Sequence, residues 1–327
     1  MDFIANLPPH FLRIPIALIL VVSLVFINAL IMVYLERKVA GHMQLRLGPM
    51  EVGWHGVLQT LIDGVKLMAK QLIVPRAAHS KLFRIAPLLA FVPSVLPFVV
   101  MPFAPKLQAA DINIGLIYIL AMASLNVFAI FVAGWASNNK YGLLGAMRSI
   151  SQGIAYEIPI ILSLLSIVFV VGSFSLGDIV SYQGKIWLFL VQPVAFLIYF
   201  VASVAETNRA PFDLPEAESE LTAGFHTEYS GMAFALFFLG EYTEIFVVSS
   251  IATAVFLGGW HGFPLPYFEY SSAVWFLLKT YCLMFLILWF RWTFPRVRFD
   301  QLLNLSWKYL IPFSLVNLLI TAVVVKL

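Results

Sequence analysis

The sequence predicts an all-α polytopic membrane protein with eight transmembrane helices and one amphipathic helix on the cytoplasmic side. Hydrophobic residues make up 61% of the 327 residues, whereas charged residues make up only 11%. Soluble domains contain about a quarter charged residues, so this chain is too apolar to be one. We therefore expect residues 1–327 to form a single membrane domain.

The transmembrane helices are predicted from stretches with few or no ionisable side chains. A helix needs about 20 mostly apolar residues to cross a hydrocarbon layer of about 30 Å. Five stretches contain no Asp, Glu, Lys or Arg, and three more contain one or two such residues. The predicted spans cover about 14–35, 85–105, 112–136, 155–171, 186–205, 229–257, 273–290 and 309–325.

Basic residues predict the orientation of these spans. Fourteen Lys and Arg lie in the loops after spans one, three, five and seven, and four lie in the opposite loops and the termini. The positive-inside rule then places both termini on the outer face. We expect the first span to remain in the protein, because it ends directly in Glu36-Arg37-Lys38 and has no small-residue cleavage site.

The loop at 36–84 contains a predicted amphipathic helix at about 54–70. Apolar residues recur there with helical spacing, and polar residues fill the opposite face. The apolar side chains are Val57, Leu58, Leu61, Ile62 and Val65, and the polar ones are Gln59, Asp63, Lys66 and Lys70. We expect this helix to lie in the membrane interface. The periodicity alone favours a helix that only anchors this loop to the membrane surface.

Acidic residues are concentrated in an expected cytoplasmic loop at 206–228 and in the span after it. Eight of the 17 acidic residues lie there: Glu206, Asp213, Glu216, Glu218, Glu220, Glu228, Glu241 and Glu244. Repulsion among carboxylates raises their pKa values and favours proton exchange near neutral pH. For Glu216, Glu218 and Glu220, an exposed loop that binds a basic partner is an equally open interpretation.

Three glutamates lie inside predicted spans: Glu157, Glu241 and Glu244. A carboxylate at the bilayer centre costs about 2.5–3.5 kcal/mol, so it needs a partner, a water-filled path or a proton. We therefore predict that these residues transfer protons. Glu241 and Glu244 are three residues apart on one helix face, so we expect them to share a proton. The structural alternative is that neutral glutamic acids bond neighbouring helices.

Several other classes of site find no support in the sequence. The single cysteine, Cys282, excludes a disulfide framework, a zinc finger and a Cys-ligated iron–sulfur cluster, each of which needs several thiolates. The six histidines show no ligand spacing, so we predict no metal site. No catalytic triad or nucleotide-binding glycine motif is evident, and a net charge of +3 does not predict nucleic acid as a partner.

The charged segments form motifs that occur together, in this order, in one family. The first motifs are Glu36-Arg37-Lys38, the run from Gln44 to Pro49, and Asp63 with Lys66. The later motifs are Arg148 to Glu157, the 26-residue run ETNRAPFDLPEAESELTAGFHTEYSG at 206–231, and Pro295-Arg296 with Asp300-Gln301. Across nearly the whole chain the sequence thus resembles the H subunit of NADH-quinone oxidoreductase, the respiratory complex I protein called subunit 1 in mitochondria.

This resemblance implies a membrane-arm subunit that forms much of a quinone-binding chamber and couples quinone reduction to proton translocation. Quinone, either ubiquinone or menaquinone, would be the substrate, and no cofactor would be bound covalently. Iron–sulfur clusters and flavin would reside in partner subunits. The implied partners are the redox-arm subunits that carry the terminal cluster and the small and antiporter-like membrane-arm subunits. The implied location is the bacterial inner (plasma) membrane.

The resemblance also implies site residues, none of them catalytic in itself. Quinone-chamber positions are matched by Arg37, Arg46, Asp63 and Phe225. The implied proton route contains Asp63, Glu157, Glu206, Asp213, Glu216, Glu218, Glu220, Glu228 and Glu241, to which the argument from the spans adds Glu244. Gln71 departs from the pattern, because the family often has Glu at that position.

Two other functions compete with this interpretation. One is an ion-coupling membrane subunit of a related energy-converting hydrogenase, which would use similar helices without quinone. A stand-alone ion transporter is the third. The complete run at 206–231 and the motif ending in Pro49 favour the quinone enzyme.

Overall fold

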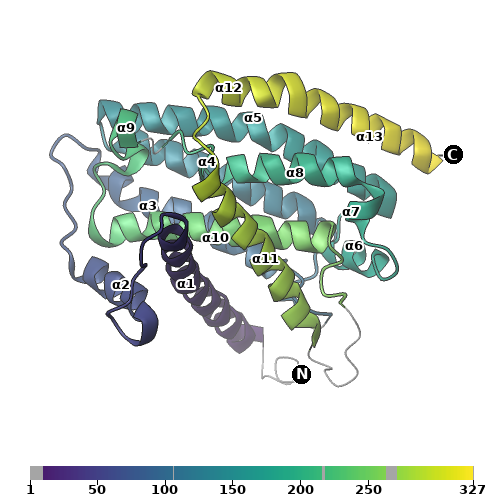
Figure 1. Ribbon diagram of the computed structural model, residues 1–327, viewed down its shortest axis with the longest axis horizontal. Helices are drawn as coiled ribbons and strands as arrows, with labels where there is room; N and C mark the ends of the chain where they lie inside the picture. Colours follow the sequence, from purple (N-terminus) through teal and green to yellow (C-terminus); the bar gives the residue numbers. More distant parts are fainter. Residues whose placement is uncertain (1–9, 106, 216–217, 263–270, 327) are drawn as a thin grey trace.

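The computed structural model describes residues 10–105, 107–215, 218–262 and 271–326, all of which fold as helices and connecting loops (Figure 1). Seven helical segments in these ranges are long and apolar enough to cross a membrane. They are α1 (His10–Met43), α3 (Ser80–Val95) with η2 (Leu96–Val99), α4 (Gly115–Ala136), α5 (Lys140–Val171), α10 (Gly231–Val255), α11 (Ser271–Thr293) and the continuous run of α12 (Phe299–Asn304), η4 (Leu305–Leu310) and α13 (Ile311–Lys326). The predicted all-α membrane fold is confirmed.

The predicted span at 186–205 differs from the others, because it is broken and short. Gln192 separates α7 (Leu188–Val191) from α8 (Pro193–Glu206). Proline has no backbone N–H and suits the first helical turn, so Pro193 starts a new helix. Helix α8 has 14 residues and is about 21 Å long, which is less than the hydrocarbon layer. Seven described helices, and not eight, therefore have spanning length.

The amphipathic helix predicted at 54–70 is found as a 3-10 turn, η1 (Trp54–Gly56), followed by α2 (Gln59–Ala69). Helix α2 contacts α1 and α10. Leu61, Val65 and Met68 remain at least half exposed on it. The remaining short elements are α6 (Leu176–Tyr182), α9 (Glu218–Leu221) and η3 (Gly224–His226).

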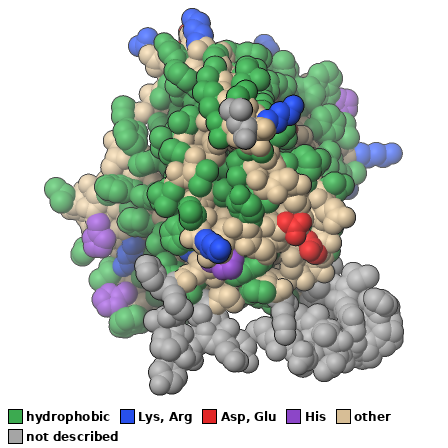
Figure 2. Space-filling model, turned by 90° about the vertical axis from the view of Figure 1, so that its right-hand side faces the viewer, with side chains coloured by type: hydrophobic (Ala, Val, Ile, Leu, Met, Phe, Trp, Pro, Cys, Tyr) green, Lys and Arg blue, Asp and Glu red, His purple; other side chains and the backbone are tan. Residues whose placement is uncertain are grey.

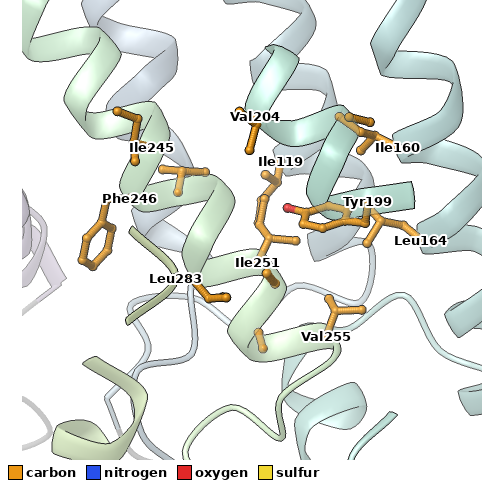
Figure 3. Packing of buried hydrophobic residues seen from close by; sticks show 14 of the residues in the cluster. Ile119, Ile160, Leu164, Tyr199, Val204, Ile245, Phe246, Ile251, Val255 and Leu283 are labelled. Carbon is orange, nitrogen blue, oxygen red and sulfur yellow. The ribbon is translucent and has the colours of Figure 1, made fainter. Parts of the chain in front are cut away.

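The core of the bundle is built around α10 and α5. Helix α10 contacts α1, α3, α8 and α11, and α5 contacts α4, α8 and α13. Figure 3 shows Ile119, Ile160, Tyr199 and Ile251 packed together where α4, α5, α8 and α10 meet. The face drawn in Figure 2 is mostly hydrophobic, with isolated charged side chains, as expected for a protein surrounded by lipid and other apolar partners.

Helix α5 begins much earlier than the predicted span at 155–171. Its first half contains Lys140, Arg148 and Gln152, so a rule that searches for uncharged stretches misses it. This polar half packs against the acidic loop. A Cβ atom at Gly145 would lie 2.9 Å from the Pro215 carbonyl oxygen, so only glycine lets the loop approach α5 so closely.

Candidate functional site

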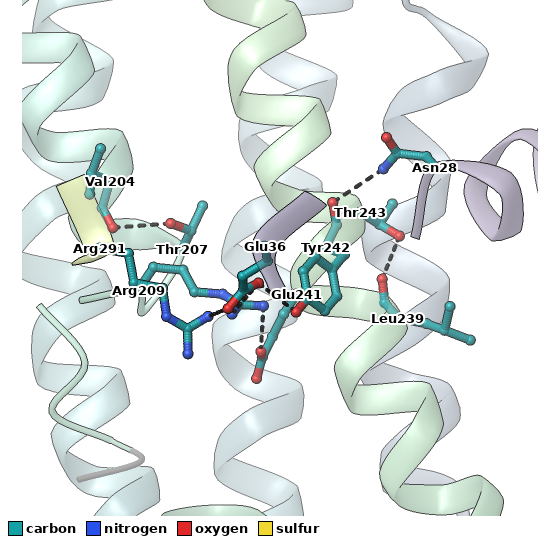
Figure 4. A network of polar contacts seen from close by, with 10 residues as sticks. All are labelled: Asn28, Glu36, Val204, Thr207, Arg209, Leu239, Glu241, Tyr242, Thr243 and Arg291. Carbon is teal, nitrogen blue, oxygen red and sulfur yellow. Dashed lines mark hydrogen bonds and ion pairs between the residues drawn. The ribbon is translucent and has the colours of Figure 1, made fainter. Parts of the chain in front are cut away.

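A group of buried charges is centred on Arg209, in the loop after α8. Its guanidinium nitrogens lie 3.6 Å from a carboxylate oxygen of Glu36 in α1 and 3.3 Å from one of Glu241 in α10. The guanidinium carbon lies 4.4 Å from the ring centroid of Tyr242, which is cation–π geometry. Figure 4 shows these side chains converging. Arg209 is thus compensated on several sides, as a buried charge must be.

Glu36 connects this group to a second arginine. Arg291, in the last turn of α11, donates a hydrogen bond to Oε1 of Glu36, and the Tyr242 hydroxyl donates one to Oε2 at 2.7 Å. We call Glu36, Arg209, Glu241, Tyr242 and Arg291 the arginine network. With both arginines and both glutamates ionised, its net charge is zero.

A cavity of about 50 Å³ lies next to the arginine network, between α3, α4, α5, α8 and α10. Its lining is mainly apolar, and we call it the polar cavity after the seven polar side chains that also line it. About 10–15 Å³ of such space holds one water molecule, so the cavity is large enough for water. Its polar lining is Ser94, Asn126, Tyr199, Glu206, Thr207, Asn208 and Glu244. Asn208 precedes Arg209 directly, so the cavity and the network adjoin along the chain.

Glu241 and Glu244 therefore have different neighbours. Glu241 faces Arg209, whereas Glu244 lines the polar cavity together with Glu206. The two carboxylates were expected to share a proton. Each of them instead has its own polar neighbour, Arg209 for Glu241 and the cavity lined by Glu206 for Glu244. The spacing of three residues indicated a shared face but could not indicate what the neighbouring helices bring to it.

Glu157 lies in α5, on the side that faces α4. The Ser124 hydroxyl of α4 donates a hydrogen bond to Glu157 Oε1. Ser124 is exposed and Glu157 is partly exposed, although both lie within helices of spanning length. A carboxylate that faces lipid is costly, so this surface requires either a proton on Glu157 or a polar cover from another chain.

At the end of the bundle where α2 lies, two of the four predicted chamber residues form an ion pair. Arg37 Nη1 lies 2.6 Å from Asp63 Oδ2, and Gln59 donates to Asp63 Oδ1 at 2.9 Å. Arg46 is exposed and donates to the Gln44 side chain at 2.7 Å. Phe225 is buried in a second hydrophobic cluster, where its ring packs at 5.4 Å from that of Phe237.

The acidic loop obtains its basic partners from distant parts of the sequence. Asp213 lies 3.1 Å from Arg296, and Glu220 lies 2.6 Å from Arg148 in α5. Glu228 accepts a hydrogen bond at 2.6 Å from the side chain of Asn139, the residue that caps α5. The prediction for Glu216, and that for the side chain of Glu218, lie outside the described residues. The sequence around this loop suggested that its negative charges have almost no basic partners. The fold shows that Arg148 and Arg296 supply such partners.

Sequence reasoning did not assign a site role to Glu36, Tyr242 or Arg291. Two signals were present: Glu36 is a carboxylate at the end of a span, and Arg209 is the one basic residue within the acidic run. Neither signal identifies a partner, because Glu36 and Arg291 are 255 residues apart. Among the described residues, no three His, Cys, Asp or Glu side chains are arranged to hold a metal ion.

Comparison with known proteins gives consistent matches over nearly the whole chain. A family profile described as NADH dehydrogenase matches residues 16–322. The H subunit of NADH-quinone oxidoreductase from Geobacillus kaustophilus is 50% identical over 310 residues, or 94% of this chain and 92% of the relative. The H subunit from Dehalococcoides mccartyi is 49% identical over 305 residues, or 93% of this chain and 85% of the relative. The H subunit from Carboxydothermus hydrogenoformans is 47% identical over 306 residues, covering 94% and 87% respectively.

Proposed function

We propose that this chain, which belongs to the NADH dehydrogenase family that includes the H subunit of NADH-quinone oxidoreductase, forms much of the quinone chamber and couples quinone reduction to proton translocation. It is an integral membrane subunit of that enzyme. The observation that carries this proposal is a series of polar sites running from the Arg37–Asp63 pair through the arginine network and the polar cavity to Ser124 and Glu157.

The quinone end of this series is the Arg37–Asp63 pair, with Arg46 as a further donor. A quinone headgroup that accepts two electrons also accepts two protons, so it needs positioned donors and an acidic neighbour. Arginines and a carboxylate provide both functions. The quinone is ubiquinone or menaquinone, and the electrons come from an iron–sulfur cluster in a redox-arm subunit, since this chain has a single cysteine.

The coupling step is electrostatic. A negative charge that forms on the headgroup attracts the nearby arginine side chains and weakens their hold on Glu36 and Glu241. A carboxylate that loses a cationic neighbour binds a proton more readily, so protons move into the network from the polar cavity. Glu206 and Glu244 line that cavity and pass the change on toward Glu157. Asp213, Glu220 and Glu228 supply protons from the cytoplasmic surface.

The proposed partners follow from the two ends of this series. The redox arm binds where the loop with Arg46 and the acidic loop, including Glu216 and Glu218, face the cytoplasm. The small and antiporter-like membrane-arm subunits bind the surface formed by α4 and α5, where they cover Ser124 and Glu157. Both termini then lie on the outer face of a bacterial plasma membrane.

The test is the exchange of one network carboxyl for an amide. Glu241→Gln preserves size and hydrogen bonding but removes the titratable group and the negative charge opposite Arg209, so donor-driven quinone reduction and ΔpH formation should fall together by roughly tenfold or more. Both rates are measured in vesicles at matched amounts of assembled enzyme.

The matched control is Asp178→Asn, an acidic residue in the first turn of α6 and outside the proposed route. It should keep native rates. Native reduction and native pumping in Glu241→Gln would reject the coupling role of the network.

A further inference from the structure

Helix α5 carries a defect in its backbone hydrogen bonding next to Glu157. Pro159 lies inside the helix. Proline has no N–H, so it cannot donate the usual i→i−4 hydrogen bond, which here would go to the carbonyl of Ala155. Ala155 is buried, where a carbonyl without a donor costs free energy.

The last helix of the chain supplies the missing donor. The buried hydroxyl of Ser306 donates a hydrogen bond to the Ala155 carbonyl oxygen. The contact is reciprocal, because the Tyr156 hydroxyl donates to the Leu302 carbonyl oxygen at 2.9 Å. In membrane helices, side chains of neighbouring helices commonly satisfy the backbone groups that proline frees.

Ser306 lies within a π-helical turn, η4, where the Ile311 N–H bonds to the carbonyl five residues earlier. Such turns are rare and occur often at functional sites. This turn interrupts the run from α12 to α13 at the level of α5 where the proline defect lies. The hydroxyl, the proline defect and Glu157 thus lie within two turns of one another.

The same short segment of α5 is also hydrogen-bonded to the loop that contains Arg209. The Gln152 amide donates to the carbonyl oxygens of Ala205 at 2.6 Å and Phe212 at 2.9 Å, on either side of Arg209. Glu157 bonds to Ser124 on the opposite flank. The orientation of residues 152–157 therefore links the loop around Arg209 to Glu157.

We propose that Ser306 is a positioning residue for Glu157: by bonding to the Ala155 carbonyl that Pro159 leaves without a donor, it fixes the turn of α5 that aims Glu157 at Ser124. This proposal rests on the proposed function of Glu157 in the proton route. Ser306 itself transfers no proton in this account. A hydroxyl that served only to stabilise the bundle would affect the amount of enzyme and leave its pH response unchanged.

The experiment compares Ser306→Ala with Ser314→Ala in the assembled enzyme. Ser314 is a matched control, because it is equally buried on the same helix run but bonds to the Ile311 carbonyl of its own helix at 2.9 Å. Donor-driven quinone reduction and ΔpH formation are recorded per assembled complex across a pH series. Ser306→Cys, with the same shape and a weaker donor, is the graded variant.

Ser306→Ala should lower turnover roughly tenfold, below the ~100-fold that a 1 Å displacement of a reacting group can cause. Its half-maximal pH should move in the same direction as in Ser124→Ala, with Ser306→Cys intermediate and Ser314→Ala native. Native turnover and a native pH profile in Ser306→Ala would overturn the proposal.

Pro159→Ala covers the case in which Ser306→Ala does not assemble. It restores an N–H that can bond to Ala155 within α5, but it does not restore the bond from η4 to α5 that orients this turn. Assembly of the double variant should therefore improve while its pH profile stays displaced. If the double variant recovers the native profile, or if every Ser306 variant fails to assemble with or without Pro159→Ala, the hydroxyl serves folding alone and the proposal is wrong.

Glu157→Gln separates this inference from the proposed function. If Glu157→Gln lowers coupled turnover and Ser306→Ala does not, only the positioning role fails. If Glu157→Gln is native, the proton route through Glu157 fails first, and the role of Ser306 with it.

Discussion

Two buried cations in this bundle are stabilised in different ways. Arg209 is surrounded by side chains: two carboxylates, and a tyrosine that contributes its ring. Lys279 in α11 is held by dipoles. Its ammonium donates to the carbonyl oxygens of Leu257 at 2.7 Å, Gly259 at 3.1 Å and His261, and it lies 4.6 Å from the ring centroid of Trp187.

We call the group around Lys279 the carbonyl clasp. Its ligands follow the C-terminal end of α10, where the helix dipole favours a cation. Gly259 has φ of +50°, and a Cβ there would lie 2.6 Å from Val180, so glycine is needed for the loop to wrap around the ammonium.

The difference between the partners of Arg209 and Lys279 indicates which of the two buried cations can take part in coupling quinone reduction to proton transfer. Carbonyl oxygens do not exchange protons, so the ligands of Lys279 in the carbonyl clasp cannot change their own charge, and the clasp acts as a structural fastening. Two of the partners of Arg209 are carboxylates, and the proposed coupling step requires a change of charge at Glu36 and Glu241. Of these two buried cations, Arg209 is therefore the candidate for coupling, because its partners are carboxylates, whereas Lys279 is bound by backbone carbonyls.

The largest expected effect is that of Arg209→Met. It leaves Glu241 buried without its cation, and breaking a buried pair by removing one partner costs about 3–5 kcal/mol. We expect a large loss of assembled enzyme and almost no quinone reduction per complex. Blue-native gels and donor-driven reduction measure the two effects.

The double variant Arg209→Met/Glu241→Met sharpens this prediction. Apolar replacement of a whole buried pair is often close to neutral, so assembly should recover while coupled activity stays lost. Recovery of neither would indicate that Arg209 acts mainly through Glu36, and recovery of both would remove the network from the mechanism.

Lys279→Met should have a smaller effect, confined to stability. Three carbonyls lose a common donor, and each buried group left without a partner costs about 1–3 kcal/mol, in part recovered by relaxation of the loop. The midpoint of thermal inactivation should fall, whereas turnover per assembled complex and its pH profile should stay native. A displaced pH profile of turnover in Lys279→Met would show that the carbonyl clasp, like the proposed arginine network, affects coupling.

The positions of most spans could be predicted from the sequence, because burial in lipid leaves long uncharged stretches. The predicted bounds were wrong where a helix contains charged or polar side chains. The first half of α5 is helical although it contains Arg148 and Gln152, since its polar face packs on a protein loop. Likewise, Pro193 shortens a helix that hydropathy alone extends.

The candidate residues could be selected from the sequence in part, for a related reason. Carboxylates in spans stand out, so Glu157, Glu241 and Glu244 are candidates from the sequence alone. The rest of the arginine network could not be selected, because the pairing of Glu36 with Arg291 depends on how α1 and α11 rotate about their own axes. The same limit hid Ser306, whose importance becomes visible only where the carbonyl that Pro159 frees meets another helix.

The smallest expected effect concerns His261, whose backbone carbonyl oxygen is one of the ligands of the carbonyl clasp. Burial lowers the pKa of the His261 imidazole below its usual value, a hydrogen bond with the Val180 backbone raises it in part, and the Lys279 ammonium lowers it again. The folded protein therefore binds this proton less readily than the unfolded chain, so the free energy of unfolding falls as pH drops below about 6.5. Thermal midpoints at pH of about 7.5 and about 5.5 should differ less in His261→Gln than in the native enzyme, with Lys279→Met lying between them because it removes one of the causes. An equal loss of stability on acidification in all three proteins would show that the His261 imidazole does not contribute to the pH dependence of the free energy of unfolding.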